Sequence, residues 1–557
     1  MNALDHVSVQ EPRPRLARSA VALLSLVALG ACAEDWVAPY NDSFSEPNMR
    51  ADLVALAHDS TRGRLVSTPE LAKVADFIRD RFDSLGLAPA GDAATYEQRF
   101  ELMWFSLIEG GRLTVRGAGG SREPGAGWYP LNVAVVGSAS GEVVFAGFGI
   151  DEPRLGWDDY RGGDLSGKVA LVLEREPGVD DPASPFDGVV TANAAREWNK
   201  ALAAQRRGAV AILFVRDVHN RPDVEDWAAA TADYWPDQPR RVERFLHPAW
   251  AVADTIPGAF ISTELAQTLV KGSGRTLQEL AQASETASNG LGIVELPGSY
   301  VELTTYVDRH RTPARNIVAM VQGSDTKLAG EAVMILAHHD HNGAAGDTIF
   351  NGADDNISGV VGLLAIAEAY AKAAAEGRGP RRSVVFVATD SEERGPSLGA
   401  GHLTMGPRFP LDSTVAVFNV DMKGRNEEIP ADGGARFNGL EPQTAESNAN
   451  AVNIIGYSRA PGLAAAVDSA NRETGLTLRF RYDNNPSNML RRSDQWPFLQ
   501  RGVPALGFMT GLHPDYHTVY DRPEKINYVK MEKIARLIHQ ASWDLANADG
   551  RPKPVAP

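Results

Sequence analysis

The residues between 338 and 393 combine the side chains that metal-dependent hydrolysis requires. His338 follows the apolar run AVMILA, Asp355 precedes an asparagine in a glycine-rich loop, and Glu392 and Glu393 are adjacent shortly after the run VVFVAT. Imidazole and carboxylate groups are common protein ligands of zinc, and a spare carboxylate can accept a proton. The combination therefore predicts a zinc site that activates a water molecule.

Two further candidate ligands follow later apolar runs. Asp421 ends the run VAVFNVD, and His517 lies shortly after VPALGF. From residue 298 onward, strand-like runs alternate with helical patterns, which predicts an α/β fold with a largely parallel sheet and helices on both faces. In such sheets, functional groups collect beyond the carboxyl ends of the strands. We therefore expect these segments to deliver their side chains to one edge of the sheet.

The N-terminal half has a different organisation. Apolar spacing predicts helices over 46–62 and 68–87, and alternation predicts strands over 96–117. Short β-rich runs among Gly, Pro and Asp turns fill 131–297, which predicts a β-rich region. Within it, the polar segment 217–248 is expected to be a long loop or lid.

Composition narrows the class of protein. The chain has 557 residues, of which 43% are hydrophobic and 23% charged, as in ordinary globular proteins. Its formal net charge is -16. An acidic surface argues against nucleic acid and anionic membrane surfaces as partners.

The N-terminus predicts export. Arg13, Arg15 and Arg18 precede the apolar run AVALLSLVALGA, and Cys32, the only cysteine, follows it directly. The basic and apolar segments are typical of a secretory signal. The sequence LGAC resembles a bacterial lipobox, which implies a lipid-anchored protein of the bacterial cell envelope, on its periplasmic or outer-membrane side. The alternative is an ordinary signal peptide with an incidental cysteine.

Five segments of the C-terminal half resemble the zinc exopeptidase family of aminopeptidase S, aminopeptidase Y and glutamate carboxypeptidase. They are AHHDH (337–341), GADDNISG (352–359), DSEERG (390–395), NVDMKG (419–424) and YHTVYD (516–521). Residues 60–100 are similar to the opening segment of that family. Residues 131–297 are similar to the protease-associated (PA) domain that many of its members carry as an insertion.

The resemblance implies two zinc ions and a role for each candidate ligand. His338 and Asp421 would bind one zinc, and Glu393 and His517 would bind the other. Asp355 would bridge both ions, and the peptide bond that follows it is expected to be cis. A metal pair of this kind can activate water and polarise the scissile carbonyl.

The resemblance also implies which residues act beside the metals. Glu392 would be the general base, and Tyr516 would stabilise the oxyanion. Asp340 would accept the far N–H of His338 and so fix its tautomer. The family pattern selects His338 among the neighbouring histidines, so structural roles are expected for His339 and His341. Structural roles are likewise expected for Asp354, Asp390 and His402, and Asp494 is expected to line the site.

These observations predict four segments. They are a lipoprotein signal peptide (1–32), the N-terminal part of a peptidase domain (36–130), a PA-like inserted domain (131–297) and a catalytic zinc-peptidase domain (298–548). The predicted function is that of a secreted dizinc exopeptidase, in particular an aminopeptidase, that acts on peptides or proteins. The alternatives are a carboxypeptidase or dipeptidase, a one-zinc glutaminyl cyclase, and an inactive receptor-like binding protein.

Overall fold

The computed structural model describes residues 37–553, apart from 132–135, 222–225, 235–244, 252–255, 396, 407–409, 433–436 and 438. The predicted signal peptide and Cys32 therefore lie outside the described residues. All elements described below belong to the unit that begins at Ala38.

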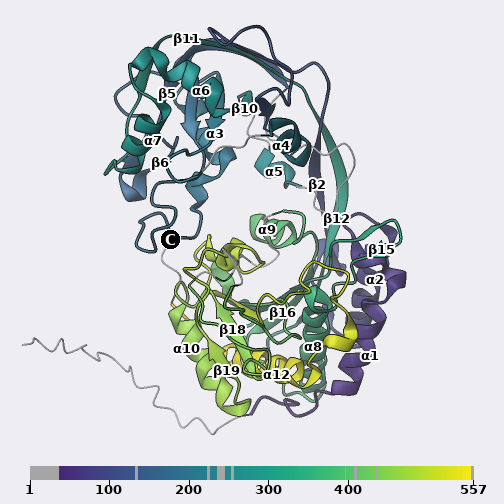
Figure 1. Cartoon of the computed structure of the whole chain (residues 1–557). Coiled ribbons are helices and arrows are strands. Elements are labelled where there is room, and N and C mark those ends of the chain that lie inside the picture. Colours follow the sequence, from purple (N-terminus) through teal and green to yellow (C-terminus); the bar gives the residue numbers. More distant parts are fainter. Residues whose placement is uncertain are drawn as a thin grey trace, which may run out of the picture. The chain divides into compact units, whose positions relative to one another are not determined.

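A nine-stranded sheet carries the C-terminal half of the chain (Figure 1). Its central strands β16, β13, β17 and β20 are parallel, as predicted, and the pairs that flank them, β12 with β16 and β18 with β20, are antiparallel. The order of the strands is β1 (Ala88–Pro89), β12 (Val307–Val321), β16 (Ser383–Thr389), β13 (Ala332–His338), β17 (Thr414–Val420), β20 (Ala505–Met509), β18 (Ala451–Ile455) and β19 (Thr477–Arg479), with β2 (Glu97–Leu107) also paired to β12.

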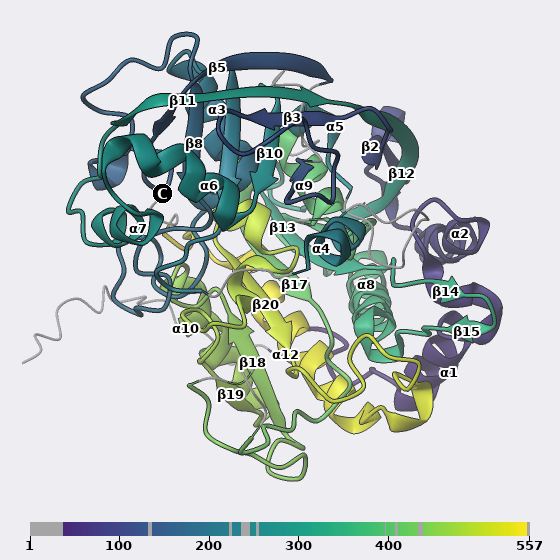
Figure 2. The ribbon, with the colours of Figure 1, turned by 45° about the horizontal axis from the view of Figure 1, so that its top comes forward.

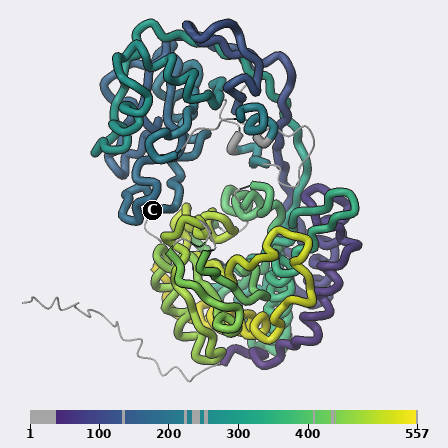
Figure 3. Tube along the Cα trace, in the orientation of Figure 1, coloured from purple at the N-terminus to yellow at the C-terminus, as the bar shows by residue number. Residues whose placement is uncertain are grey.

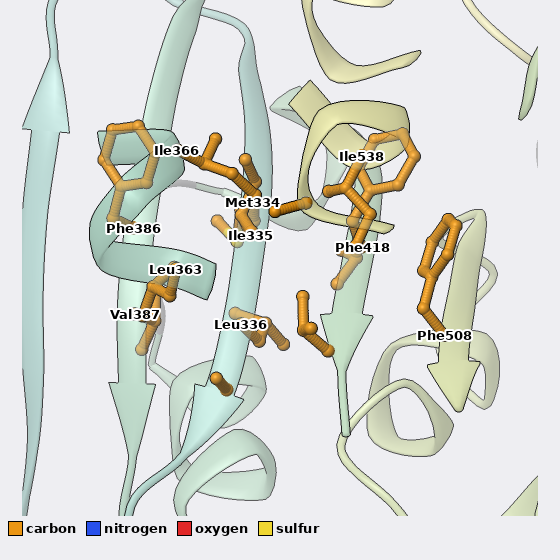
Figure 4. Close-up of a cluster of buried hydrophobic side chains, with 14 of the residues drawn as sticks. Met334, Ile335, Leu336, Leu363, Ile366, Phe386, Val387, Phe418, Phe508 and Ile538 are labelled. Carbon is orange, nitrogen blue, oxygen red and sulfur yellow. The ribbon is translucent and has the colours of Figure 1, made fainter. Parts of the chain in front are cut away.

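The central strands are buried on both faces, which explains their unbroken apolar runs. Every residue of β13, β16, β17 and β20 is buried. Helices α8 (Gly359–Ala375) and α12 (Tyr528–Asn547) pack on these strands. Figure 4 shows Leu363 and Ile366 of α8 beside strand residues such as Phe386, and Ile538 of α12 beside Phe418. This packing fixes the strand ends from which the candidate ligands project.

One buried helix has the composition of a membrane span. The stretch Ala353–Ala375 is long and apolar enough to cross a bilayer by length and composition alone. Inside the structure, 72% of its most apolar window is buried, which is typical of a core helix. Its hydrophobicity therefore follows from its position against the sheet.

The N-terminal helices also pack on the catalytic half, where the purple segment in Figure 3 lies beside α8 and α12. Helix α1 (Glu46–Leu56) ends earlier than the predicted 46–62. Helix α2 (Pro69–Ser84), with Thr68 as its N-cap, lies within the predicted 68–87. Between them, the backbone has positive φ at Arg62, Gly63 and Arg64. A side chain at Gly63 would meet the carbonyl oxygen of Gly343 at 2.2 Å, so this turn requires glycine.

A seven-stranded sheet forms from the N-terminal half (Figure 2). Helices α3 (Glu197–Arg206), α6 (Thr263–Val270) and α7 (Leu277–Glu285) accompany it. Its strand order is β3 (Arg112–Val115), β11 (Val294–Thr305), β5 (Gly137–Phe145), β8 (Val169–Leu173), β9 (Ala211–Val215), β10 (Gly258–Ile261) and β4 (Trp128–Pro130).

This second sheet extends beyond the predicted limits 131–297. Strands β3 and β4 precede residue 131, and β11 continues to Thr305. The reason is a long antiparallel ladder in which β2 pairs with β12 from Glu97–Ile317 to Leu107–Val307. Strands β3 and β11 then pair with each other beyond the end of this ladder. The same two chain segments thus contribute strands to both sheets.

The segment 217–248, predicted to be a loop or lid, contains a helix. Helix α4 (Trp227–Tyr234) lies in its described part, and helix α5 (Pro248–Ala251) follows. The carboxylate of Asp226 accepts the backbone N–H of Ala229, as an N-terminal cap does. The sequence analysis missed this helix because it is short and its many Trp, Asp and Pro neighbours suggest a loop.

Burial of His539 predicts a loss of stability in acid. Its ring is fully buried in α12, its Nδ1 lies 3.1 Å from Asn41 Oδ1, and burial lowers its pKa to about 3. The unfolded chain takes up the proton near pH 6.5, so stability is lost as the pH falls from there toward about 3. Between about pH 6.5 and 4.5, His539 should lower the free energy of unfolding by about 2 kcal/mol. The measurement is denaturant unfolding at a series of pH values.

The test compares two histidine-to-glutamine variants. His539→Gln should flatten the dependence of unfolding free energy on pH over that interval, even if it lowers stability at neutral pH. His219, which is exposed, provides the matched control His219→Gln. An equally steep loss in His539→Gln and the wild type would contradict the prediction.

Candidate active site

The five predicted metal ligands converge beyond the carboxyl ends of the parallel strands. His338 is the last residue of β13, Asp421 directly follows β17, and Glu393 follows β16 by four residues. His517 lies in the loop after β20, and Asp355 lies in the short helical segment Ala353–Ser358 that precedes α8. The parallel register of these strands brings all five side chains together, as the sequence predicted.

Their side chains form two clusters that share one residue. In the first cluster, His338 Nε2 lies 3.3 Å from Asp421 Oδ1 and 3.4 Å from Asp355 Oδ1. In the second, His517 Nε2 lies 3.0 Å from Asp355 Oδ2 and 3.0 Å from Glu393 Oε2. Asp355 therefore turns one carboxylate oxygen toward each cluster, which is the arrangement expected of a bridging ligand.

The backbone around Asp355 is held on several sides. Its N–H and that of Asp354 donate to the carboxylate of the buried Asp521. The next residue, Asn356, donates to Val420 O at 2.9 Å, just before Asp421. The Asp355–Asn356 peptide bond is cis, as the resemblance implied.

The donor set fits divalent metal ions, zinc in particular. Imidazole nitrogens and carboxylate oxygens that ligate one zinc at about 2.0–2.2 Å lie about 3–4 Å apart. The ligand atoms of each cluster lie within 4.8 Å of one another. His517 Nε2 is buried and makes no hydrogen bond to any described residue, although two carboxylates face it. Several buried carboxylates also meet here, and bound cations would offset their mutual repulsion.

Glu392 lies next to the clusters, but its carboxylate belongs to neither of them. It is 9% exposed. Burial, together with the neighbouring carboxylates of Asp421 and Glu393, raises the pKa of Glu392 well above its usual range. A carboxylate made more basic in this way is better suited to accept a proton near neutral pH.

Asp340 is fully buried, but it holds the glutamates more closely than it holds His338. Its Oδ1 accepts the backbone N–H of Glu392 at 3.0 Å, and its Oδ2 accepts that of Glu393 at 3.2 Å. The distance from its Oδ1 to His338 Nδ1 is 3.6 Å, whereas the Asp340 backbone carbonyl lies at 3.3 Å from that nitrogen. The carboxylate thus sets the direction of the two adjacent glutamates.

Tyr516 lies at the open side of the second cluster. Its ring stacks on His517 at 3.8 Å between centroids, and its hydroxyl accepts a hydrogen bond from Arg492 at 3.0 Å. Burial raises the pKa of Tyr516 well above its usual value, so the hydroxyl keeps its proton and can donate it in a hydrogen bond.

The structure separates the residues for which structural roles were expected. His339 points away from both clusters, with Nδ1 2.7 Å from Thr389 O, and burial lowers its pKa to about 4. His402 Nδ1 pairs with His247 Nε2 at 2.9 Å. Asp494 is fully buried and accepts the hydroxyl of Thr389, so it supports a strand end and does not line an open surface. His341 differs from these, because it lies within the second cluster.

Arg64 is a site residue that sequence reasoning missed. It is 0% exposed and donates to four backbone carbonyls of the ligand-bearing loops. Its partners are His339 O at 3.0 Å, Asn351 O at 2.5 Å, Gly352 O at 3.0 Å and Asp355 O at 3.4 Å. Its guanidinium thus joins the loop after His338 to the loop that carries Asp355. No motif marks it, because its partners are backbone atoms of segments almost 300 residues away.

We expect Arg64→Met to weaken metal binding without removing a ligand. Residues that orient ligands typically contribute about 10–100-fold to metal affinity or activity. The measurement is zinc affinity by competition with a chromophoric chelator. Arg62→Met is the matched control, because Arg62 is exposed and, in the described part of the chain, donates to Gly346 O alone. Equal zinc affinities of the two variants would contradict this role.

The mixed α/β fold and the paired clusters define a class of protein, a metal-dependent hydrolase. Residues 316–542 match the family model of Peptidase family M28. All residues of the two clusters, with Glu392 and Tyr516, fall within this segment. The segment therefore belongs to peptidase family M28, and the protein is a zinc metallopeptidase whose substrates are peptides.

Several solved structures are similar to this chain, and one of them supports the fold. The aminopeptidase from Aneurinibacillus sp. strain AM-1 is 17% identical, over 93% of this chain and 97% of that one, with a TM-score of 0.50. BSAP, a zinc aminopeptidase from Bacillus subtilis, is 15% identical over 92% and 98%, with a TM-score of 0.42. A peptidase M28 precursor from Shewanella amazonensis is 18% identical over 93% and 97%, with a TM-score of 0.41. At these identities, the first likeness supports the fold alone.

Proposed function

We propose that this protein is an exported dizinc exopeptidase and that it acts as an aminopeptidase. The observation that carries the proposal is the position of Asp355, whose two oxygens face two separate ligand clusters. His338 and Asp421 would hold one zinc, Glu393 and His517 the other, and Asp355 both. Zinc bound there would activate a water molecule and polarise the scissile carbonyl.

Glu392 would then transfer the proton, and Tyr516 would stabilise the negative charge that develops on the carbonyl oxygen. The Glu392 carboxylate would accept a proton from the attacking water and pass it to the leaving amine nitrogen. The Tyr516 hydroxyl, kept protonated by burial and oriented by Arg492, would donate a hydrogen bond to the oxyanion. Asp340 would keep Glu392 in place through the hydrogen bond to its backbone N–H.

The charge around the site bears on which end of the peptide is recognised. Glu392 is a carboxylate next to the clusters that is not a metal ligand, and it favours a substrate with a free ammonium group at its N-terminus. Arg492 favours a second candidate, because it is exposed beside Tyr516 and could pair with a terminal carboxylate. A carboxypeptidase or dipeptidase is therefore the alternative that an observation supports.

One experiment distinguishes these functions. Purified protein is loaded with zinc, its metal content is measured, and it is given matched peptides with free or acetylated N-termini and free or amidated C-termini. We expect two zinc ions per chain and stepwise release of N-terminal residues that acetylation prevents. Release of residues that depends on a free C-terminus would indicate a carboxypeptidase or dipeptidase and contradict the aminopeptidase assignment.

Other outcomes point to the remaining alternatives. One zinc per chain with cyclisation of an N-terminal glutamine would indicate a glutaminyl cyclase. Two zinc ions without turnover of any peptide would indicate a receptor-like binding protein.

The second sheet, with its similarity to PA domains, is proposed to shape access to the site. Support comes from Asp187, between β8 and β9, which accepts a hydrogen bond from Arg459 at 2.6 Å and pairs with Arg491. Arg491 directly precedes Arg492, which contacts Tyr516. The contact thus reaches the segment that borders the proposed substrate site.

For localisation, we propose that Cys32 is lipidated and anchors the mature chain in the cell envelope. Cys32→Ala should shift the protein from the membrane fraction to the soluble fraction, or leave it unprocessed. The measurement is fractionation with N-terminal mass analysis. Cys32→Ser controls for the loss of the thiol alone and should behave like Cys32→Ala. A soluble wild type that begins at another residue would exclude the anchor.

A further inference from the structure

We propose that His341 is a fourth protein ligand of the metal site formed by Glu393, His517 and Asp355, so that the two metal sites are unequal. This inference rests on the proposed function, because it assumes that both clusters bind metal. It goes beyond the resemblance, in which His341 has no metal role.

The geometry places His341 Nδ1 among the other ligand atoms. It lies 2.8 Å from Glu393 Oε1 and 3.7 Å from Asp355 Oδ2. These two carboxylates also face His517 Nε2, each at 3.0 Å. Four ligands around a tetrahedral zinc at about 2.0–2.1 Å lie about 3.3 Å apart, and the separations in this cluster lie on both sides of that value.

The surroundings of His341 hold its ring in this position. The side chain is 0% exposed, and its backbone N–H donates to Arg64 O at 3.0 Å. Gly352 leaves space for the ring, since a side chain there would lie 2.4 Å from His341 Cδ2. The His341 and His517 rings are 5.7 Å apart and nearly perpendicular. The ring thus has one well-defined direction, toward the cluster.

The rival role is a hydrogen bond from His341 that merely positions Glu393. A single N–H on Nδ1 can serve Glu393 Oε1, but it leaves Asp355 Oδ2 at 3.7 Å, beyond hydrogen-bond distance. A cation at the centre of the four atoms would interact with both carboxylates and both imidazoles. The geometry therefore favours ligation over positioning.

A fourth ligand would make the two sites chemically different. The second site would have two imidazoles and two carboxylates, whereas among the described residues the first has His338, Asp355 and Asp421 alone. Closed four-ligand zinc sites are typically structural, and three-ligand sites keep a position open for water or substrate. Added imidazole also favours metals such as zinc and cobalt. We therefore expect the second site to fill first and the first site to exchange its metal more readily.

The test is a titration of the metal-free protein with Co²⁺, followed by visible absorption and equilibrium dialysis. The wild type should bind two ions in two steps, the first at least about 10-fold tighter. His341→Asn keeps an amide N–H near the position of Nδ1 but loses the ring nitrogen that ligates. In this variant, the cobalt affinity of the tighter step should fall by about 10–100-fold or more, because even residues that only orient ligands contribute that much to metal affinity. His339→Asn, in the neighbouring buried histidine outside the cluster, should keep wild-type affinities.

A second measurement needs no variant. With one equivalent of Co²⁺, the proton NMR spectrum of the wild type should show two hyperfine-shifted imidazole N–H signals, from His341 and His517. A single such signal, or a His341→Asn variant with wild-type cobalt affinities and spectrum, would overturn the inference and leave the dizinc proposal intact. A wild type that binds fewer than two ions would overturn both.

Discussion

Replacing Glu392 with glutamine should leave both metals bound and remove nearly all turnover. The amide keeps the size of the side chain but cannot accept the proton of the attacking water. Loss of a general base typically costs about 10²–10⁴-fold in rate. The measurement is kcat on an N-terminally free peptide, together with zinc content. Glu392 is not part of either ligand cluster, so the metal content should not change.

The matched control is Glu446→Gln, the same chemical change at an exposed position. It should have wild-type kcat and zinc content. A fully metallated Glu392→Gln variant with near-normal turnover would exclude Glu392 as the base. If that variant lost zinc instead, Glu392 would have to be reassigned as a ligand.

Asp355→Asn should have the largest effect on metal binding, because Asp355 is the one described residue that contributes to both clusters. The amide is neutral and can present only one oxygen, so both metals lose a charged ligand at once. The loss of zinc affinity should exceed the about 10–100-fold that residues outside the ligand set contribute. Activity should fall with it, as measured by isothermal titration and peptide hydrolysis.

Variants of residues that belong to one cluster provide the comparison. Asp421→Asn should weaken the first site and leave the second, and Glu393→Gln should do the reverse. If Asp355→Asn weakened only one site, Asp355 would be an ordinary ligand and not a bridge. If all three variants bound two ions as tightly as the wild type, the clusters would not be the metal sites.

The sequence predicts the catalytic sheet and its ligands well because both depend on local patterns. The strands β13, β16 and β17 are unbroken apolar runs, and each ligand follows a strand or opens a helix. Once the runs are assigned to parallel strands, the meeting of His338, Glu393 and Asp421 at one edge follows from topology.

What the sequence could not predict depends on contacts between distant segments. Arg64 binds backbone carbonyls, and a carbonyl gives no signature of residue type. His341 looked structural because the family pattern selects one histidine from the run AHHDH, and only the direction of its side chain places it in a cluster. The second sheet extends past the predicted limits because strand β11 continues into β12 with only Tyr306 between them, and β3 follows β2 after a short turn.

The ladder between β2 and β12 also bears on how such a protein can change in evolution. Leu107 and Val307 pair at the end of the β2–β12 ladder. The chain between them therefore starts and ends at the same place on the catalytic sheet. A short hairpin turn could in principle close the same ladder. The entropy of closing a loop grows only slowly with its length, so a whole sheet can replace a turn here at small cost to the rest of the molecule. Lineages could therefore gain, exchange or lose this module while the strands that carry the metal ligands stay the same.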